Sequence, residues 1–65
     1  MRTNFAAARI NAGLSQAEVG RRLGVDQSTV SYWESGKKFP RGATLVKLAD
    51  LYCRTIGELM GRDSA

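Results

Sequence analysis

Two short helices are indicated by the segment Ser15-Gln-Ala-Glu-Val-Gly-Arg-Arg-Leu-Gly24-Val-Asp-Gln-Ser-Thr-Val30-Ser-Tyr-Trp-Glu34. Apolar residues recur at helical spacing on both sides of one glycine, and they are Val19, Leu23, Val25, Val30 and Trp33. Small residues stand between them at Ala17 and Gly20, so that two helices can pack together at a steep angle. The pattern therefore predicts that the chain reverses at Gly24 and buries one face of each helix.

Both helices begin at residues that stabilise a helix N-terminus. Ser15 and Glu18 have the spacing of a capping box, in which the Ser hydroxyl accepts a backbone N–H and the Glu side chain reaches back. Asp26 can cap the second helix alone. Gly24 follows the last apolar residue of the first helix, where a left-handed conformation reverses the chain at no steric cost. We expect any residue with a Cβ to strain the turn at this position.

The exposed face of the second helix has an unusual composition. At about 100° per residue its polar side chains fall in one arc, which contains Gln27, Ser28, Ser31, Tyr32 and Ser35. A polar arc on an amphipathic helix is most often a solvated face. Such faces usually carry Lys, Glu and Arg, whereas this arc carries a Gln, three Ser and a Tyr, which suit the edges of bases. The composition therefore favours contact with DNA more than an ordinary polar face would.

Several short segments together form a specific pattern: Gly13–Glu18 (GLSQAE), Gly24-Val25, Ser31–Gly36 (SYWESG), Pro40 and Leu45–Ala49 (LVKLA). In these segments the chain resembles the Cro and phage-repressor family of helix-turn-helix proteins, also called the xenobiotic-response-element type, from about Phe5 to Met60. The resemblance implies an all-α fold, a compact five-helix lambda-repressor-like DNA-binding domain with a central helix-turn-helix at about 16–35. It places helices near 3–12, 16–23, 27–35, 42–52 and 56–60.

The residue pattern and the resemblance together predict roles for individual residues. The expected contacts to bases in the major groove come from Gln27, Ser28, Ser31 and Tyr32. The expected contacts to the DNA backbone come from Gln16, Arg9, Lys37, Lys38 and Arg41. Structural roles are expected for Gly24, for an ion pair between Arg9 and Glu34, and for Trp33. A stacking platform for single-stranded bases is the alternative for Trp33, and its place on the apolar arc favours the core.

Basic residues gather directly after the second helix of the motif. The chain carries a net charge of +4, and Ser35–Ala49 contains four basic residues and no acidic one. These four are Lys37, Lys38, Arg41 and Lys47. Basic loops are commonly just solvated, but beside a helix that enters a groove the same charges would lie along the phosphates. Counterion release would then supply much of the affinity.

The two ends of the chain have the pattern of packed helices. We expect Phe5 in the core and Thr3 or Asn4 as the cap of the first helix. Thr55 and Glu58 form a second capping box before the last helix. The chain departs from the family pattern at Gly20, at Gly42 and at the Cys53-Arg54 corner.

Length and composition exclude several other classes of protein. A chain of 65 residues is expected to form one domain over 1–65, with residues 62–65 frayed. No apolar run approaches the roughly 18 residues of a membrane span. The single Cys53 and the absence of His exclude an internal disulfide and a Cys-based zinc site. We expect no enzymatic activity, no cofactor, no metal and no membrane partner, and a reducing, cytoplasmic setting of bacterial or phage type.

The sequence thus predicts a regulator of transcription, more specifically a repressor, that binds a palindromic or pseudo-palindromic double-stranded operator. We expect a homodimer, at least on DNA, with Ile56 and Met60 at the contact; in the alternative both pack inward beside Leu59. A different class stays open, namely an antitoxin-like or partner-binding module that uses the same fold mainly to hold a protein. The chain has only about five residues after its last expected helix, which favours the repressor.

Overall fold

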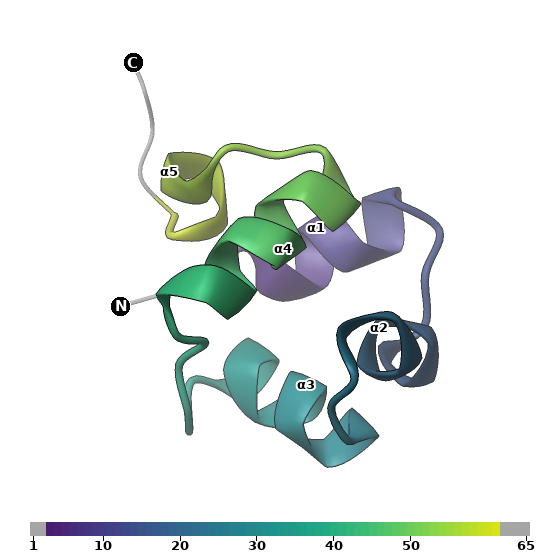
Figure 1. Ribbon diagram of the computed structural model, residues 1–65. Helices are drawn as coiled ribbons and strands as arrows, with labels where there is room; N and C mark the ends of the chain where they lie inside the picture. The colour runs from purple at the N-terminus through teal and green to yellow at the C-terminus, as the bar shows by residue number, and fades with distance from the viewer. Residues whose placement is uncertain (1–2, 62–65) are drawn as a thin grey trace.

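The computed structural model describes residues 3–61, and over that range it contains five α-helices and no strand (Figure 1). The helices are α1 (Phe5–Asn11), α2 (Gln16–Leu23), α3 (Gln27–Ser35), α4 (Gly42–Tyr52) and α5 (Ile56–Leu59). In Figure 1 α3 lies along the lower edge and α5 at the upper left, with α4 and α1 between them. The all-α prediction is confirmed, and the expectation for residues 62–65 falls outside the described range.

The first helix begins two residues later than the sequence predicts, at Phe5 and not at residue 3. Asn4 occupies the capping position, but its side chain accepts no hydrogen bond from the first turn. Its Nδ2 instead donates to the carbonyl of Glu58 at 2.8 Å, and its backbone N–H donates to the carbonyl of Leu59 at 2.9 Å. The predicted cap is therefore wrong, because Asn4 fastens the start of α1 to α5.

Every helix contributes to one apolar core. The buried side chains are Phe5, Ala8, Val19, Val30, Trp33, Leu48, Tyr52 and Leu59. Trp33 is buried among them, so its indole is not available as an exposed stacking platform. Burial of side chains of this size stabilises a fold by about 1.5–3 kcal/mol each, so the loss of one large member would be felt in all five helices.

The corner between α2 and α3 is made by two glycines. Gly24 ends α2 in the left-handed conformation at φ 73°, as the sequence predicts. Gly20 lies one turn earlier, where an added Cβ would come within 2.8 Å of the carbonyl oxygen of Val25. Since the carbonyl belongs to the backbone, the missing side chain at Gly20 is what allows the turn to pack this closely on α2.

The two predicted capping boxes differ. Thr55 and Glu58 form a complete box at α5, with hydrogen bonds of 3.1 Å and 2.8 Å. At α2 the Ser15 hydroxyl accepts the N–H of Glu18 at 3.0 Å, but the structure shows no return bond from the Glu18 side chain. The Glu18 carboxylate lies instead 3.6 Å from Arg22 and 3.8 Å from Arg21. The first box is therefore only half formed, and its carboxylate lies near two arginines instead.

The corner between α4 and α5 has no glycine. Cys53 takes the left-handed position at φ 55°, and it is the one residue other than glycine with a positive φ within residues 3–61. A residue with a Cβ pays about 1–2 kcal/mol for this conformation. Although Cys53 departs from the family pattern, α4 still ends in a left-handed residue. The cost is a lower stability of the fold.

Candidate nucleic-acid interface

The polar arc of α3 faces an open hollow of about 450 Å³. Six polar residues line it, and they are Gln16, Asp26, Gln27, Ser28, Ser31 and Tyr32. All four residues expected to contact bases therefore lie together, and Gln16 reaches them from the start of α2. Asp26 belongs to the same surface, although the sequence indicated only its role as a cap. Its position directly before Gln27, the first residue of the arc, is the sequence feature that could have predicted this.

Asp26 and Ser28 form a tight hydrogen-bonded pair at the start of α3. The Oδ2 atom of Asp26 accepts the backbone N–H of Ser28 at 3.0 Å and lies 2.5 Å from the Ser28 Oγ. These two bonds hold the pKa of Asp26 below its ordinary value, and the bond from the Ser28 hydroxyl is the larger cause. The cap is therefore a carboxylate at neutral pH, and it lies within the hollow.

Two lysines lie close to the ring of Tyr32 at the other end of α3. The Nζ atoms of Lys37 and Lys38 lie 5.8 Å and 5.7 Å from the ring centroid, within the range of a cation–π interaction. The backbone N–H groups of both lysines point to the Tyr32 carbonyl, at 3.0 Å and 3.3 Å. The local backbone thus holds two positive charges beside a ring that belongs to the polar arc.

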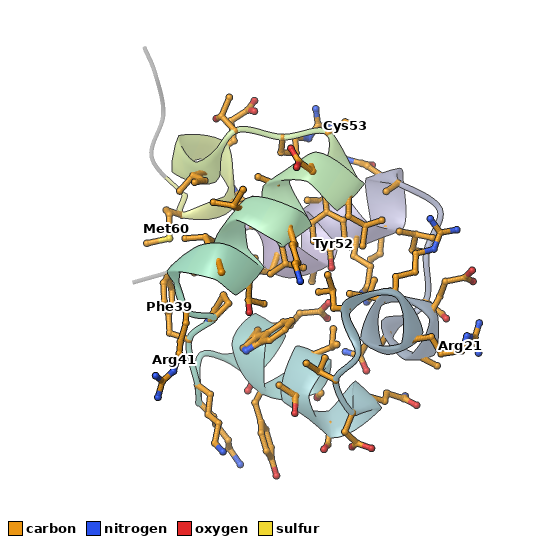
Figure 2. All side chains as sticks on the ribbon, in the orientation of Figure 1. Arg21, Phe39, Arg41, Tyr52, Cys53 and Met60 are labelled. Atoms are coloured by element: carbon orange, nitrogen blue, oxygen red, sulfur yellow. The ribbon has the colours of Figure 1, made fainter. Side chains whose placement is uncertain are left out.

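The loop that follows α3 is anchored to the core. The ring of Phe39 meets Phe5 edge to face, with 6.0 Å between the centroids. Figure 2 shows Arg41 extending from the start of α4 toward the lower edge of the molecule, where α3 also lies, whereas Arg21 points away beyond α2. Lys47 lies apart from the other three basic residues, in a second hollow of about 320 Å³ that it shares with Arg22, Leu23, Asp50 and Leu51.

An ion pair joins α1 to the end of α3, as the resemblance implies. Arg9 donates from Nε to Glu34 at 2.6 Å and from Nη2 at 3.2 Å, and its Nη1 donates to the carbonyl of Leu14 at 2.9 Å. The side chains are only 16% and 9% exposed. The hydrogen bond to Glu34 is the main cause that raises the pKa of Arg9. Arg9 is thus engaged inside the protein and does not line the hollow.

Gln16 is a member of this network, which the sequence did not predict. Its Nε2 donates to the Oε1 of Glu34 at 2.9 Å. The start of α2 is thereby fixed to the end of α3, and the Gln16 amide is held at the edge of the hollow. The negative charge of Glu34 also acts on the buried Tyr52: burial raises the pKa of that phenol to about 12, and Glu34 adds to the rise.

Residues 3–61 contain neither a metal-binding cluster nor a membrane-spanning helix. That range contains no cluster of three or more His, Cys, Asp or Glu side chains that could hold a metal ion. None of the helices described there has the length and apolar character needed to cross a membrane.

Comparison with known proteins identifies the family. A family model of helix-turn-helix proteins matches residues 5–59, which include both α2 and α3 and every buried residue of the apolar core. A search of the curated proteins and a search of the solved structures find no match. The matched segment covers most of the chain, and the protein therefore belongs to the helix-turn-helix family of the Cro and phage-repressor type.

Proposed function

We propose that this helix-turn-helix protein is a sequence-specific repressor that inserts α3 into the major groove of double-stranded DNA. Membership of the family supports DNA binding and regulation of transcription. The observation that carries the finer proposal is the hollow, because it brings four polar side chains of α3 together with Gln16 on one surface. A groove-binding helix uses its N-terminal residues on base edges, and that is where Gln27 and Ser28 lie.

In this proposal Gln27, Ser28, Ser31 and Tyr32 contact bases. Gln27 is exposed at the first position of α3, and its amide can form two hydrogen bonds to the N6 and N7 atoms of adenine. Tyr32 is 38% exposed and lies five residues further along the helix, near the two lysines. No catalytic step is part of the proposal, since the surface offers hydrogen-bonding groups and no paired acid and base.

The backbone contacts come from Gln16, Lys37, Lys38 and Arg41. The lysines are exposed next to the polar arc, so a duplex on α3 would bring its phosphates close to their ammonium groups. Such contacts position the protein and carry no sequence information. Arg9, which was also expected on the backbone, has three hydrogen bonds inside the protein, and we assign it the positioning of α3 through Glu34.

The proposal includes a homodimer on a palindromic or pseudo-palindromic operator. One recognition helix covers only a few base pairs, and two of them about one helical turn apart give the specificity that a repressor needs. At α5 Leu59 is fully buried, Ile56 is 40% exposed and Met60 is half-buried. Figure 2 shows Met60 on the same side of the molecule as Phe39, which is 51% exposed. These apolar side chains support a contact between copies.

The decisive experiment is selection of a preferred duplex from a random pool, followed by affinity measurements. Gln27→Ala should weaken binding to the selected duplex by about 1–3 kcal/mol and relax the preference at one base pair. Lys37→Ala should weaken binding to all duplexes alike and lower the slope of log affinity against log salt by about 1. Asn11→Ala, an exposed change at the end of α1, serves as the control. A folded Gln27→Ala protein with unchanged affinity and preference would refute the assignment of α3.

A further inference from the structure

The pair formed by Asp26 and Ser28 has a hydrogen-bond direction that the geometry determines. Only one proton can lie between the Asp26 Oδ2 and the Ser28 Oγ, which are 2.5 Å apart. The same Oδ2 also accepts the Ser28 N–H, so the charged form of the carboxyl is favoured and the pKa of Asp26 is lowered. An ionised carboxylate only accepts. The proton therefore comes from the Ser28 hydroxyl.

The direction of this hydrogen bond determines whether the pair presents donors or acceptors to a ligand in the hollow. A hydroxyl has one proton and two lone pairs, so once Ser28 has donated to Asp26 its Oγ can only accept. The other carboxylate oxygen of Asp26 is likewise only an acceptor. Both residues are exposed and line the hollow. The start of α3 thus presents hydrogen-bond acceptors and no side-chain donor from either residue.

The hydroxyl does not readily turn away from Asp26. Hydrogen bonds to an ionised group are roughly twice as strong as those between neutral groups. Turning the Ser28 hydroxyl toward a neutral acceptor on a base would exchange the stronger kind of bond for the weaker one. The Ser28 N–H, which caps α3 through the same oxygen, holds the carboxylate in place at 3.0 Å.

We propose that Asp26 and Ser28 specify a base that offers an exocyclic amine in the major groove, N4 of cytosine or N6 of adenine. The inference rests on the proposed function, and it names the chemistry of one operator position. Guanine presents only acceptors at N7 and O6, and thymine presents the acceptor O4 and a methyl group, so neither supplies a proton to this pair. Cytosine fits best, because its edge offers a donor without the neighbouring N7 acceptor of adenine.

The first arm of the test compares selected sequences for three variants. Asp26→Asn keeps an oxygen for the cap but replaces the other oxygen with an amide donor, so the preference for cytosine or adenine at one pair should change toward guanine or thymine. Ser28→Ala should reduce the preference at that pair by about tenfold. Asp50→Asn removes the same charge from exposed α4, outside this hollow, and should leave every preference unchanged.

The main comparison of the second arm uses the unaltered protein, so that comparison does not depend on the folding of a variant. In the selected duplex the cytosine is replaced by 2-pyrimidinone, or the adenine by purine, which removes only the amine. Affinity should fall by about tenfold for the unaltered protein and stay unchanged for the Asp26→Asn, Ser28→Ala double variant. The analogue that lowers affinity identifies the base.

The outcomes separate this inference from the function on which it rests. A protein that binds every duplex alike would refute the proposed function, and this inference with it. A selective protein whose preference is the same in Asp26→Asn and Ser28→Ala would overturn the inference alone. Guanine or thymine at the pair that responds to Ser28→Ala, or full affinity for both amine-free duplexes, would overturn it as well.

Discussion

The chain reverses direction between α2 and α3 and again between α4 and α5, and the two corners use different residues. In each, a helix ends in a left-handed residue and the next helix begins at a side-chain cap. The first corner uses Gly24 and the close approach of Gly20, and it sets the angle of the helix proposed to enter DNA. The second uses Cys53 and a complete capping box before a helix of four residues. Tight packing is thus concentrated at the corner that positions the polar arc.

The largest expected difference is in the free energy of unfolding of the Gly20→Val and Gly57→Val variants. Both changes place a β-branched residue in a helix beside a corner, so their cost in helix propensity is similar. At Gly20 the new Cβ meets the Val25 carbonyl at 2.8 Å, whereas at Gly57 its nearest neighbour is the Thr55 Oγ1 at 3.9 Å. Chemical denaturation should show that Gly20→Val loses about 3 kcal/mol more of the free energy of unfolding. Equal losses would show that the first corner is no tighter than the second.

The next contrast concerns assembly at the second corner. Ile56→Asp places a charge on the exposed apolar face of α5, and we expect it to weaken binding to a palindromic duplex about tenfold without unfolding the chain. Val46→Asp is the matched control, because Val46 is 50% exposed on α4. Sedimentation with the duplex should give two copies for the unaltered protein. One copy at saturation, with no effect of Ile56→Asp, would argue against the dimer.

Opposite substitutions at the two left-handed residues test how much each conformation costs. Gly24→Ala introduces a Cβ at φ 73° and should lower the free energy of unfolding by about 1 kcal/mol. Cys53→Gly removes a Cβ at φ 55° and should raise it by about 0.5–1 kcal/mol. Thermal unfolding of both variants measures the pair of shifts. If Cys53→Gly is destabilising, the conformation at the second corner is not strained.

The smallest effect is the acid dependence of the two caps. Hydrogen bonds from Ser28 lower the pKa of Asp26 below its ordinary value of 3.8, and those from Thr55 lower the pKa of Glu58 below 4.5. A carboxylate with a lowered pKa stabilises the fold fully above its ordinary value, and this contribution disappears as the pH falls through the lower value in the folded protein. Stability should therefore decrease with falling pH below about pH 4.5.

Asp26→Asn and Glu58→Gln should each flatten part of this decrease, as followed by denaturation at a series of pH values. Asp50→Asn is the control for an exposed acid that caps no helix. If the decrease in the unaltered protein matches that of both cap variants, neither carboxylate is linked to folding.

Helix positions were predictable from the sequence because they depend on local signals. α2 and α3 begin and end as expected, since apolar spacing, the caps Ser15 and Asp26, and Gly24 act within a few residues. α4, which has no side-chain cap, has the bounds that the family resemblance implies. The start of α1 was not predictable, because Asn4 bonds to the backbone of α5, 54 residues away. The site divides in the same way. The arc of Gln27 and Tyr32 lies on one helix and was predictable, whereas the bond from Gln16 to Glu34 joins two helices and was not.

The contact between Asn4 and α5 ties local opening at one end of the molecule to opening at the other. A helix of four residues has almost no stability of its own, so α5 depends on its capping box, on the burial of Leu59 and on the bonds from Asn4 to the carbonyls of Glu58 and Leu59. We therefore expect the first turn of α1 and the whole of α5 to open as one cooperative unit, although they lie far apart in sequence. Their amide protons should exchange with solvent deuterium together, at a common rate that Asn4→Ala accelerates in both.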